Sequence, residues 1–149
     1  MITETRLIWD MPITIKLVDT KGNMSHIEDV FAYFEKIDTI FNSFKTDSEV
    51  SRINRGEVDD KKWSKEMIEV IALCEQTKKE TNGYFDHLKG NAIDPLGMVK
   101  GWAVWKGTQI LKGHGLSNFS SYKSFINWTS SIRKSVYTIR KSGNCRRIV

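Results

Sequence analysis

The chain has 149 residues, a formal net charge of +5, a pI near 9.2 and a mean hydropathy of −0.39. The length suits one domain, and the hydropathy together with 11% aromatic residues excludes an integral membrane protein and a fully disordered chain. The basicity is local, because the last thirty residues hold seven Lys and Arg and no acidic residue. Residues 1–119 are therefore slightly acidic, which argues against a nucleic-acid partner for this part of the chain.

The two cysteines, Cys74 and Cys145, form neither a disulfide framework nor a metal-ligand spacing. The N-terminal residues carry no cleavage-site pattern, and no window approaches about 18 consecutive apolar residues. We therefore expect a reducing, cytoplasmic location and no membrane partner.

The first predicted element is a strand, since apolar and polar residues alternate over residues 13–18. Turn-forming residues follow at 19–23, and Ser25 and Glu28 then have the spacing of a capping box ahead of a long helix. The apolar stripe of this helix consists of Ile27, Val30, Phe31, Phe34, Ile37, Ile40, Phe41 and Phe44. Its spacing fits one buried helix face.

Two further helices are predicted before residue 84. Asp47 or Ser48 can cap a short helix that stops at Gly56. Ser64 can cap a long helix that ends near residues 82–83. The side chains expected to be buried on this long helix are Met67, Ile68, Ile71 and Cys74.

A connection over residues 84–96 leads to another predicted helix, which begins near Gly97 and ends around Gly113 or Gly115. Its expected buried residues are Met98, Val99, Trp102, Ala103 and Ile110. Trp102 and Trp105 are three residues apart, so we expect at least one to be buried. A strand begins within residues 116–119.

The pattern changes after Phe119, where serine becomes frequent and the acidic residues end. A ragged helix and a strand over residues 136–139 are both open interpretations here. The positions that would mark the helix are Phe125, Trp128, Ile132, Val136 and Ile139.

Two glycine-containing segments are candidates for chemistry, residues 81–86 and 94–103. In the second, Pro95 favours an extended Asp94, and Gly97 and Lys100 follow where a helix begins. A helix N-terminus offers unpaired N–H groups that suit a phosphate or pyrophosphate. The plainer interpretation is a capping aspartate, a turn glycine and an exposed lysine, and neither a Walker A loop nor a dinucleotide fingerprint is present.

The other candidates are weaker. His26, His87 and His114 have no ligand spacing, so we expect surface residues. Asp86 follows two aromatic residues, where an acid can hold a ribose or a ring nitrogen or serve only as a turn residue. Cys74 shares its helix face with apolar residues and is expected in the core.

Several segments resemble the FAD:protein FMN transferase family, the ApbE family. The resemblance covers about residues 9–119 in order and at family-like spacing. The matching segments are residues 12–15 (PITI), 41–54 (FNSFKTDSEVSRIN), 81–86 (TNGYFD), 94–103 (DPLGMVKGWA) and 115–119 (GLSNF). The family implies an α+β fold with a T-fold-like antiparallel sheet and packed helices.

The resemblance also implies an activity: Mg²⁺-dependent transfer of FMN from FAD to a threonine or serine of a target flavoprotein, with release of AMP. The positions that would bind FAD by this resemblance are Phe44, Tyr84, Phe85, Asp86, Asp94 and Lys100. Gly97 would offer its main-chain carbonyl to Mg²⁺. The catalytic residues of the family would lie in a later part of the fold.

The chain also departs from the family pattern. Trp9, Asp10 and Met11 replace a Met-Gly-Thr motif, Asn42 replaces a serine, and Leu96 replaces the serine of Asp-Pro-Ser-Gly. Neither the Gly-Gly-Asp segment nor the later aspartate and Ser/Thr that hold Mg²⁺ can be found in residues 120–149. We therefore expect residues 1–119 to be the N-terminal part of a truncated transferase domain, weakly active or inactive, and residues 120–149 to be an anomalous basic tail.

A frameshift or an interrupted gene would explain the abrupt change at residue 119. Two other function classes stay open. One is a non-catalytic FAD or FMN binding module built on residues 84–103. The less favoured one is a nucleic-acid binder that stacks bases on Tyr122, Phe125 and Trp128 of the basic tail.

Overall fold

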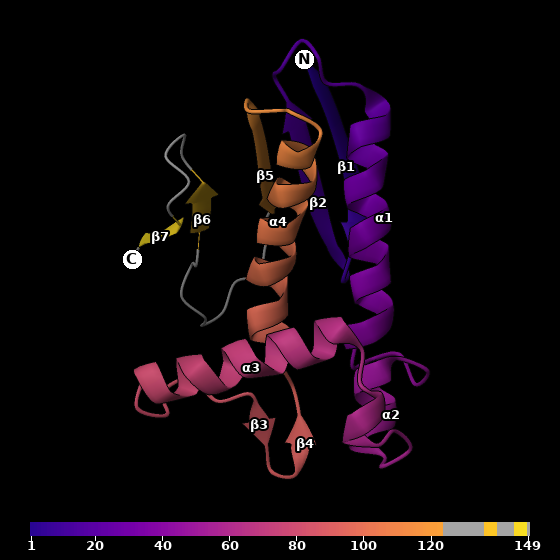
Figure 1. The fold of residues 1–149 in the computed structure, drawn as a ribbon, viewed down its shortest axis with the longest axis vertical. Coiled ribbons are helices and arrows are strands. Elements are labelled where there is room, and N and C mark those ends of the chain that lie inside the picture. The colour runs from indigo at the N-terminus through magenta and orange to yellow at the C-terminus, as the bar shows by residue number, and fades with distance from the viewer. Residues whose placement is uncertain (124–135, 140–144, 149) are drawn as a thin grey trace. The chain divides into compact units, whose positions relative to one another are not determined.

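The computed structural model describes residues 1–123, 136–139 and 145–148 (Figure 1). Its contacts divide the chain into two units, Met1–Phe31 with Thr108–Val149 and Ala32–Gly107. Helices α1 (Met24–Phe41) and α4 (Leu96–Gly113) contribute residues to both units. The fold is α+β with small antiparallel sheets and packed helices, which confirms the predicted class.

The first unit contains a three-stranded antiparallel sheet in the order β1-β2-β5, with β1 at Ile2–Ile8, β2 at Met11–Leu17 and β5 at Phe119–Lys123. The strand predicted at 13–18 is thus confirmed as β2, and the strand expected to begin within 116–119 is β5. Ile13, Ile15 and Leu17 of β2 are fully buried. The sheet places these three side chains in the core of the first unit.

Strand β1 was not predicted, because charged side chains interrupt its apolar period. Arg6 stands where a purely apolar strand would have an apolar residue, and it pairs with Glu4 at 3.5 Å and with Glu28 of α1. Its guanidinium carbon also lies 4.7 Å from the centre of the Phe31 ring. Local pairing therefore makes a half-buried arginine compatible with this strand.

The β1–β2 hairpin turns through two residues that both have positive φ, Trp9 (52°) and Asp10 (56°). Ile8 pairs with Met11 directly across this two-residue loop. A type I′ turn requires such angles, and glycine or asparagine is the usual solution. Here a tryptophan and an aspartate occupy the left-handed region, so the turn carries backbone strain.

The N-terminus of α1 is capped by Asn23, not by the predicted Ser25–Glu28 box. The His26 N–H donates to Asn23 Oδ1 at 3.2 Å, and the Asn23 N–H donates to His26 Nδ1 at 3.3 Å. This is the reciprocal geometry of a capping box, moved two residues toward the N-terminus and closed by an imidazole. Glu28 is displaced from the predicted role because it pairs with Arg6.

The C-terminus of α1 also corrects the prediction. The stripe from Ile27 to Phe41 is buried, and the largest side chains, Phe31, Phe34 and Phe41, are fully buried. Phe44 lies beyond the end of the helix, and its side chain is 83% exposed. The Asn42 side chain accepts the Phe44 N–H at 3.0 Å, so the chain turns away before Phe44 can join the stripe.

The second unit contains α2 (Glu49–Asn54), a 3-10 turn at Asp60–Lys62 and α3 (Lys65–Glu80). Ser48 and Ser64 are the N-caps of α2 and α3, accepting the N–H of Ser51 and Met67 respectively. Both predicted caps are thus confirmed, and of the two alternatives for α2 the N-cap is Ser48, not Asp47. The buried face of α3 differs from the prediction, because Val70 is buried, Ile68 is 54% exposed and Ile71 is only half-buried.

Helix α4 confirms the predicted helix from about Gly97 to Gly113. Trp102 is buried and Trp105 is half exposed. The Trp102 Nε1–H donates to Glu69 Oε1 of α3 at 3.0 Å, and Lys106 Nζ lies 2.9 Å from Glu69 Oε2. One carboxylate therefore links α3 to two successive turns of α4 within the second unit.

Cys74 on α3 is fully buried, as predicted. Burial raises the pKa of its thiol to about 12, and the neighbouring Glu75 carboxylate adds to this effect. The thiolate is therefore suppressed at neutral pH, and Cys74 acts as a core residue.

The described residues also contain two short strand pairs. The connection 84–96 contains a hairpin of β3 (Leu88–Lys89) and β4 (Ala92–Ile93). The sequence did not predict this hairpin, because strands of two residues are too short to show an alternating apolar pattern. In the basic tail, β6 (Val136–Ile139) pairs with β7 (Cys145–Ile148), so the strand interpretation holds over 136–139. Phe125, Trp128 and Ile132, which marked the helical alternative, lie outside the described residues.

Candidate functional site

The β3–β4 hairpin brings the two candidate segments together in the second unit. Leu88 pairs with Ile93, and the Asp94 N–H donates to the His87 carbonyl at 2.7 Å. A Cβ placed on Gly97 would lie 3.8 Å from Phe85 Cε2, so the aromatic ring borders the start of α4. Residues 85–87 and 94–97 therefore lie side by side, and we call these two segments the hairpin site.

The hairpin site includes the N-terminus of α4. Asp94 Oδ1 accepts the Leu96 N–H at 3.3 Å, and the Pro95 carbonyl accepts the N–H groups of Met98 and Val99. The capping interpretation of Asp94 is thus confirmed. Gly97 is not a turn residue, since it lies in the first turn of the helix and is exposed. A small ligand can approach the backbone there because Gly97 has no side chain of its own.

The loop before the hairpin presents the aromatic residues. Asn82 and Gly83 both have positive φ and end α3, and the Phe85 N–H donates to Thr81 Oγ1 at 3.0 Å. This turn leaves Tyr84 83% exposed and Phe85 partly buried. The geometry suits a planar ligand, because one ring is held by packing and the other is accessible.

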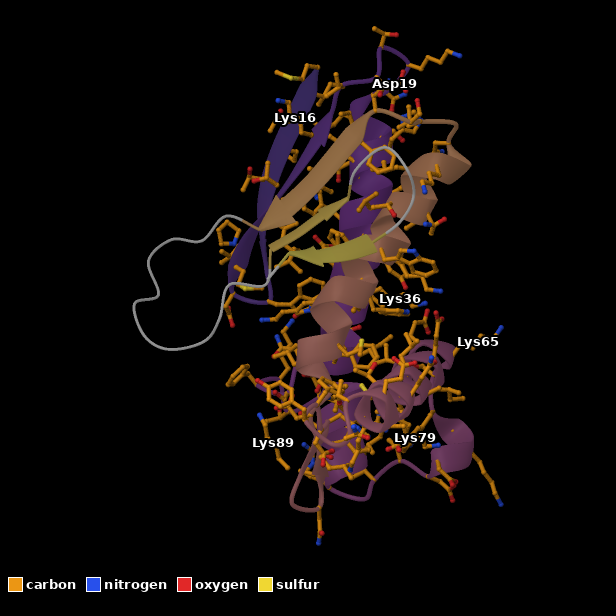
Figure 2. The ribbon with its side chains drawn as sticks, turned by 90° about the vertical axis from the view of Figure 1, so that its left-hand side faces the viewer. Lys16, Asp19, Lys36, Lys65, Lys79 and Lys89 are labelled. Carbon is orange, nitrogen blue, oxygen red and sulfur yellow. The ribbon has the colours of Figure 1, made fainter. Side chains whose placement is uncertain are left out.

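Both acidic residues of the hairpin site are paired with lysines. Lys78 Nζ lies 2.9 Å from Asp86 Oδ2, and Lys89 of the hairpin, which is labelled in Figure 2, pairs with Asp94 Oδ2. The pKa of Asp86 is lowered, first by the hydrogen bond from Lys78 and then by the Leu88 N–H, which donates to Asp86 Oδ1. Asp86 is therefore an anion in the folded protein, and a ligand group that binds it competes with a lysine.

His87 corrects the prediction of a surface histidine. Its side chain is buried, with Nε2 3.3 Å from Glu75 Oε1 and Nδ1 4.0 Å from Asp86 Oδ1. His26 and His114 lie in the first unit, where their ring centroids are 4.5 Å apart with the planes tilted by 33°, and His114 Nε2 lies 2.9 Å from Asp29 Oδ2. The histidine spacing carried no signal for His87, because its burial follows from the hairpin.

The remaining predicted residues lie farther along the chain. Lys100 follows Gly97 by one turn of α4 and is half-buried. Phe44 belongs to a separate connection, between α1 and α2, and its exposed ring is not packed into the hairpin site. The structure thus brings together Phe85, Asp86, Asp94 and Gly97, with Tyr84 and Lys100 adjoining them along the chain.

Asn54, the last residue of α2, was given no role by the sequence analysis. Its Nδ2 donates to the Ile93 carbonyl at 3.0 Å, and its Oδ1 accepts the Ile93 N–H at 2.8 Å. The side-chain amide therefore binds the backbone of β4 at Ile93, the residue before Asp94. The signal available in the sequence was that Asn54 ends the family-like segment 41–54.

A Mg²⁺ ion implied by the resemblance does not fit the described residues as a complete site. No group of three His, Cys, Asp or Glu side chains that could hold a metal occurs among residues 1–123, 136–139 and 145–148. The carboxylate nearest to Gly97 in sequence is that of Asp94, which already forms an ion pair with Lys89 and accepts the Leu96 N–H. A backbone carbonyl alone does not meet the oxygen-rich coordination that Mg²⁺ requires.

Solved structures with a similar fold are flavin transferases named ApbE. The flavin transferase ApbE from Vibrio cholerae aligns with a TM-score of 0.70 at 13% identity, covering 99% of this chain and 67% of that one. Its H257G mutant gives a TM-score of 0.69 at 13% identity, with 99% and 69% coverage. The apo form of Pseudomonas stutzeri flavinyl transferase ApbE gives 0.70 at 15% identity, with 83% and 58% coverage.

No curated protein matches the chain. Within the part of the chain that the structure describes, no helix has the length and apolar character needed to cross a membrane. The model of the ApbE family matches residues 9–92, which is more than half of the sequence and includes the loop 81–86, Asn54 and most of the hairpin. The chain therefore belongs to the ApbE family.

Proposed function

We propose that the hairpin site binds FAD, and that the chain derives from a transferase that moves FMN from FAD to a threonine or serine of a target flavoprotein. In this reaction the hydroxyl oxygen bonds to the FMN phosphorus, the bond between the two phosphates breaks, and the hydroxyl proton and AMP leave. The observation that carries the proposal is the Asp94 N–H to His87 carbonyl bond, which lays the two family-like segments side by side.

Different residues of the hairpin site would bind different parts of FAD. Phe85 and Tyr84 offer rings for a flavin or an adenine, Asp86 and Asp94 offer carboxylates for ribityl, ribose or ring N–H groups, and Lys100 offers a cation. The N-terminus of α4 suits the pyrophosphate by the positive end of its dipole. Phe44 would join the ligand from the α1–α2 connection.

Mg²⁺ would supply charge neutralisation on the pyrophosphate. The Gly97 carbonyl is the one donor of this chain that the resemblance assigns to it, so the proposal routes no step through the metal. For the same reason we expect FAD binding without efficient transfer. A non-catalytic FAD or FMN binding module is the second candidate, supported by the absence of a three-ligand cluster in the described residues.

One experiment separates the two candidates. The 149-residue chain is titrated into FAD with and without Mg²⁺, using flavin fluorescence, and is then incubated with Mg²⁺ and a flavoprotein that carries an acceptor threonine. We expect saturable binding and little or no covalent FMN by mass. Robust Mg²⁺-dependent transfer would favour the intact enzyme over the binding module, and failure to bind FAD would overturn both.

A further inference from the structure

We infer that Asn54 is a positioning residue for flavin binding: its side-chain amide fixes β4 and thereby sets the position of Asp94 and the start of α4. The inference rests on the proposed function. Asn54 and Ile93 are 39 residues apart in sequence, yet they exchange two hydrogen bonds, at 3.0 and 2.8 Å. The amide therefore takes the place that a neighbouring strand would occupy.

The need for such a clamp follows from the shortness of the hairpin. Strands β3 and β4 have two residues each, and their outer faces are exposed or half-exposed. A two-stranded hairpin of this length has too few ladder bonds to be stable alone. Asn54 supplies a donor and an acceptor to the edge of β4, so both polar groups of Ile93 are paired on that side.

The clamp acts directly on the hairpin site. Ile93 is followed by Asp94, whose N–H binds the His87 carbonyl and whose Oδ1 caps the α4 N-terminus. A shift of the Ile93 peptide would therefore move the Asp94 carboxylate and the first turn of α4 together. Asn54 itself need not touch the ligand, because its effect passes through the backbone of β4.

The position of Asn54 is itself well defined. It ends α2, whose N-terminus is closed by the Ser48 cap and whose C-terminus turns at Gly56, with φ of 74°. Val50 of the same helix is fully buried. The amide is thus carried by a helix that is fixed at both ends.

The test uses two variants and a matched control in the full chain. Asn54→Asp keeps the shape but loses the donor to the Ile93 carbonyl, and Asn54→Leu loses both bonds. Asn91→Asp adds the same charge to the same hairpin at an exposed position, away from the clamp. Far-UV circular dichroism checks the fold of each variant, and FAD affinity is measured by flavin fluorescence at about pH 8.

We expect Asn54→Asp and Asn54→Leu to bind FAD about tenfold more weakly at pH 8, the loss expected for a disrupted backbone hydrogen bond. Asn91→Asp should stay within about twofold of the wild type. Equal affinity of all four proteins would overturn the positioning role.

Hydrogen exchange separates this inference from the proposed function. The Ile93 and Asp94 amides of the ligand-free chain should exchange at least tenfold faster in Asn54→Leu, which loses both hydrogen bonds, and at an unchanged rate in Asn91→Asp. Unchanged protection would overturn the clamp whether or not FAD binds. If the wild-type chain binds no FAD, the proposed function fails, and the exchange rates alone decide whether Asn54 holds the segment.

Discussion

Lys78 Nζ lies 2.9 Å from Asp86 Oδ2 and so ties the last turns of α3 to the loop that presents the hairpin site. This hydrogen bond is the main reason that the pKa of Asp86 lies below its ordinary value. The folded protein therefore holds the Asp86 proton less tightly than the unfolded chain does. The resulting stabilisation is full above the ordinary aspartate pKa and is lost as the pH falls through the lower pKa of the folded state.

This linkage predicts the behaviour of Lys78→Met. Above about pH 5 the variant should unfold at a lower urea concentration than the wild type, and the difference should shrink as the pH falls below the ordinary aspartate pKa. The measurement is the urea midpoint from pH 2.5 to 7. Lys79→Met, one residue along the same helix and at an exposed position (Figure 2), is the control. A pH-independent difference would contradict the assignment.

Phe41 and Phe44 should respond in opposite ways to truncation. Phe41 is fully buried and its ring meets the Trp102 ring edge-on at 6.2 Å, so Phe41→Ala should cost about 3–5 kcal/mol of the free energy of unfolding. Phe44→Ala should change it by less than about 0.5 kcal/mol, because the ring is exposed. Under the proposed function Phe44→Ala should weaken FAD binding several-fold. Urea denaturation and flavin titration of both variants check this.

Asp10→Gly should stabilise the first unit. Both turn residues of the β1–β2 hairpin have positive φ, which costs a residue with a Cβ about 1–2 kcal/mol. Glycine removes this cost but is more flexible in the unfolded chain, which offsets part of the stabilisation. We therefore expect the free energy of unfolding to rise by about 0.5–1 kcal/mol. Asp10→Ala is the matched control and should be neutral or destabilising. The free energy of unfolding in urea decides between them.

The origin of residues 120–149 is also testable. We propose that the loss of acidic residues after Phe119 marks out-of-frame translation. Reading the DNA past codon 119 in the other two frames should then reveal a Gly-Gly-Asp segment. If neither frame encodes it, the frameshift explanation is wrong.

Helices were predictable wherever local signals agreed. Ser48 and Ser64 combine a capping side chain with a following apolar period, and both caps occur as predicted. The Ser25–Glu28 pair had equally good spacing but failed, because Arg6 of a distant strand engages Glu28. A capping pattern thus predicts a helix start only to within a turn when its acidic member has another partner.

The sequence proposed residues for the candidate site, but how they come together could not be predicted. Asp94 and Gly97 were identified from a turn-to-helix pattern, and Phe85 and Asp86 from the loop before it. Neither the burial of His87 nor the role of Asn54 could be inferred, since both depend on a hairpin whose strands are two residues long. Contacts that span 39 residues leave no periodic trace in the sequence.

The long sequence separation of the Asn54–Ile93 pair has a consequence for the order of folding. Closing a loop of that length costs configurational entropy that the hairpin alone cannot recover. Its contacts are therefore expected to form after α2 and α3 have packed, on the native side of the folding barrier. Substitutions at Asn54 should then accelerate unfolding and leave the rate of folding nearly unchanged.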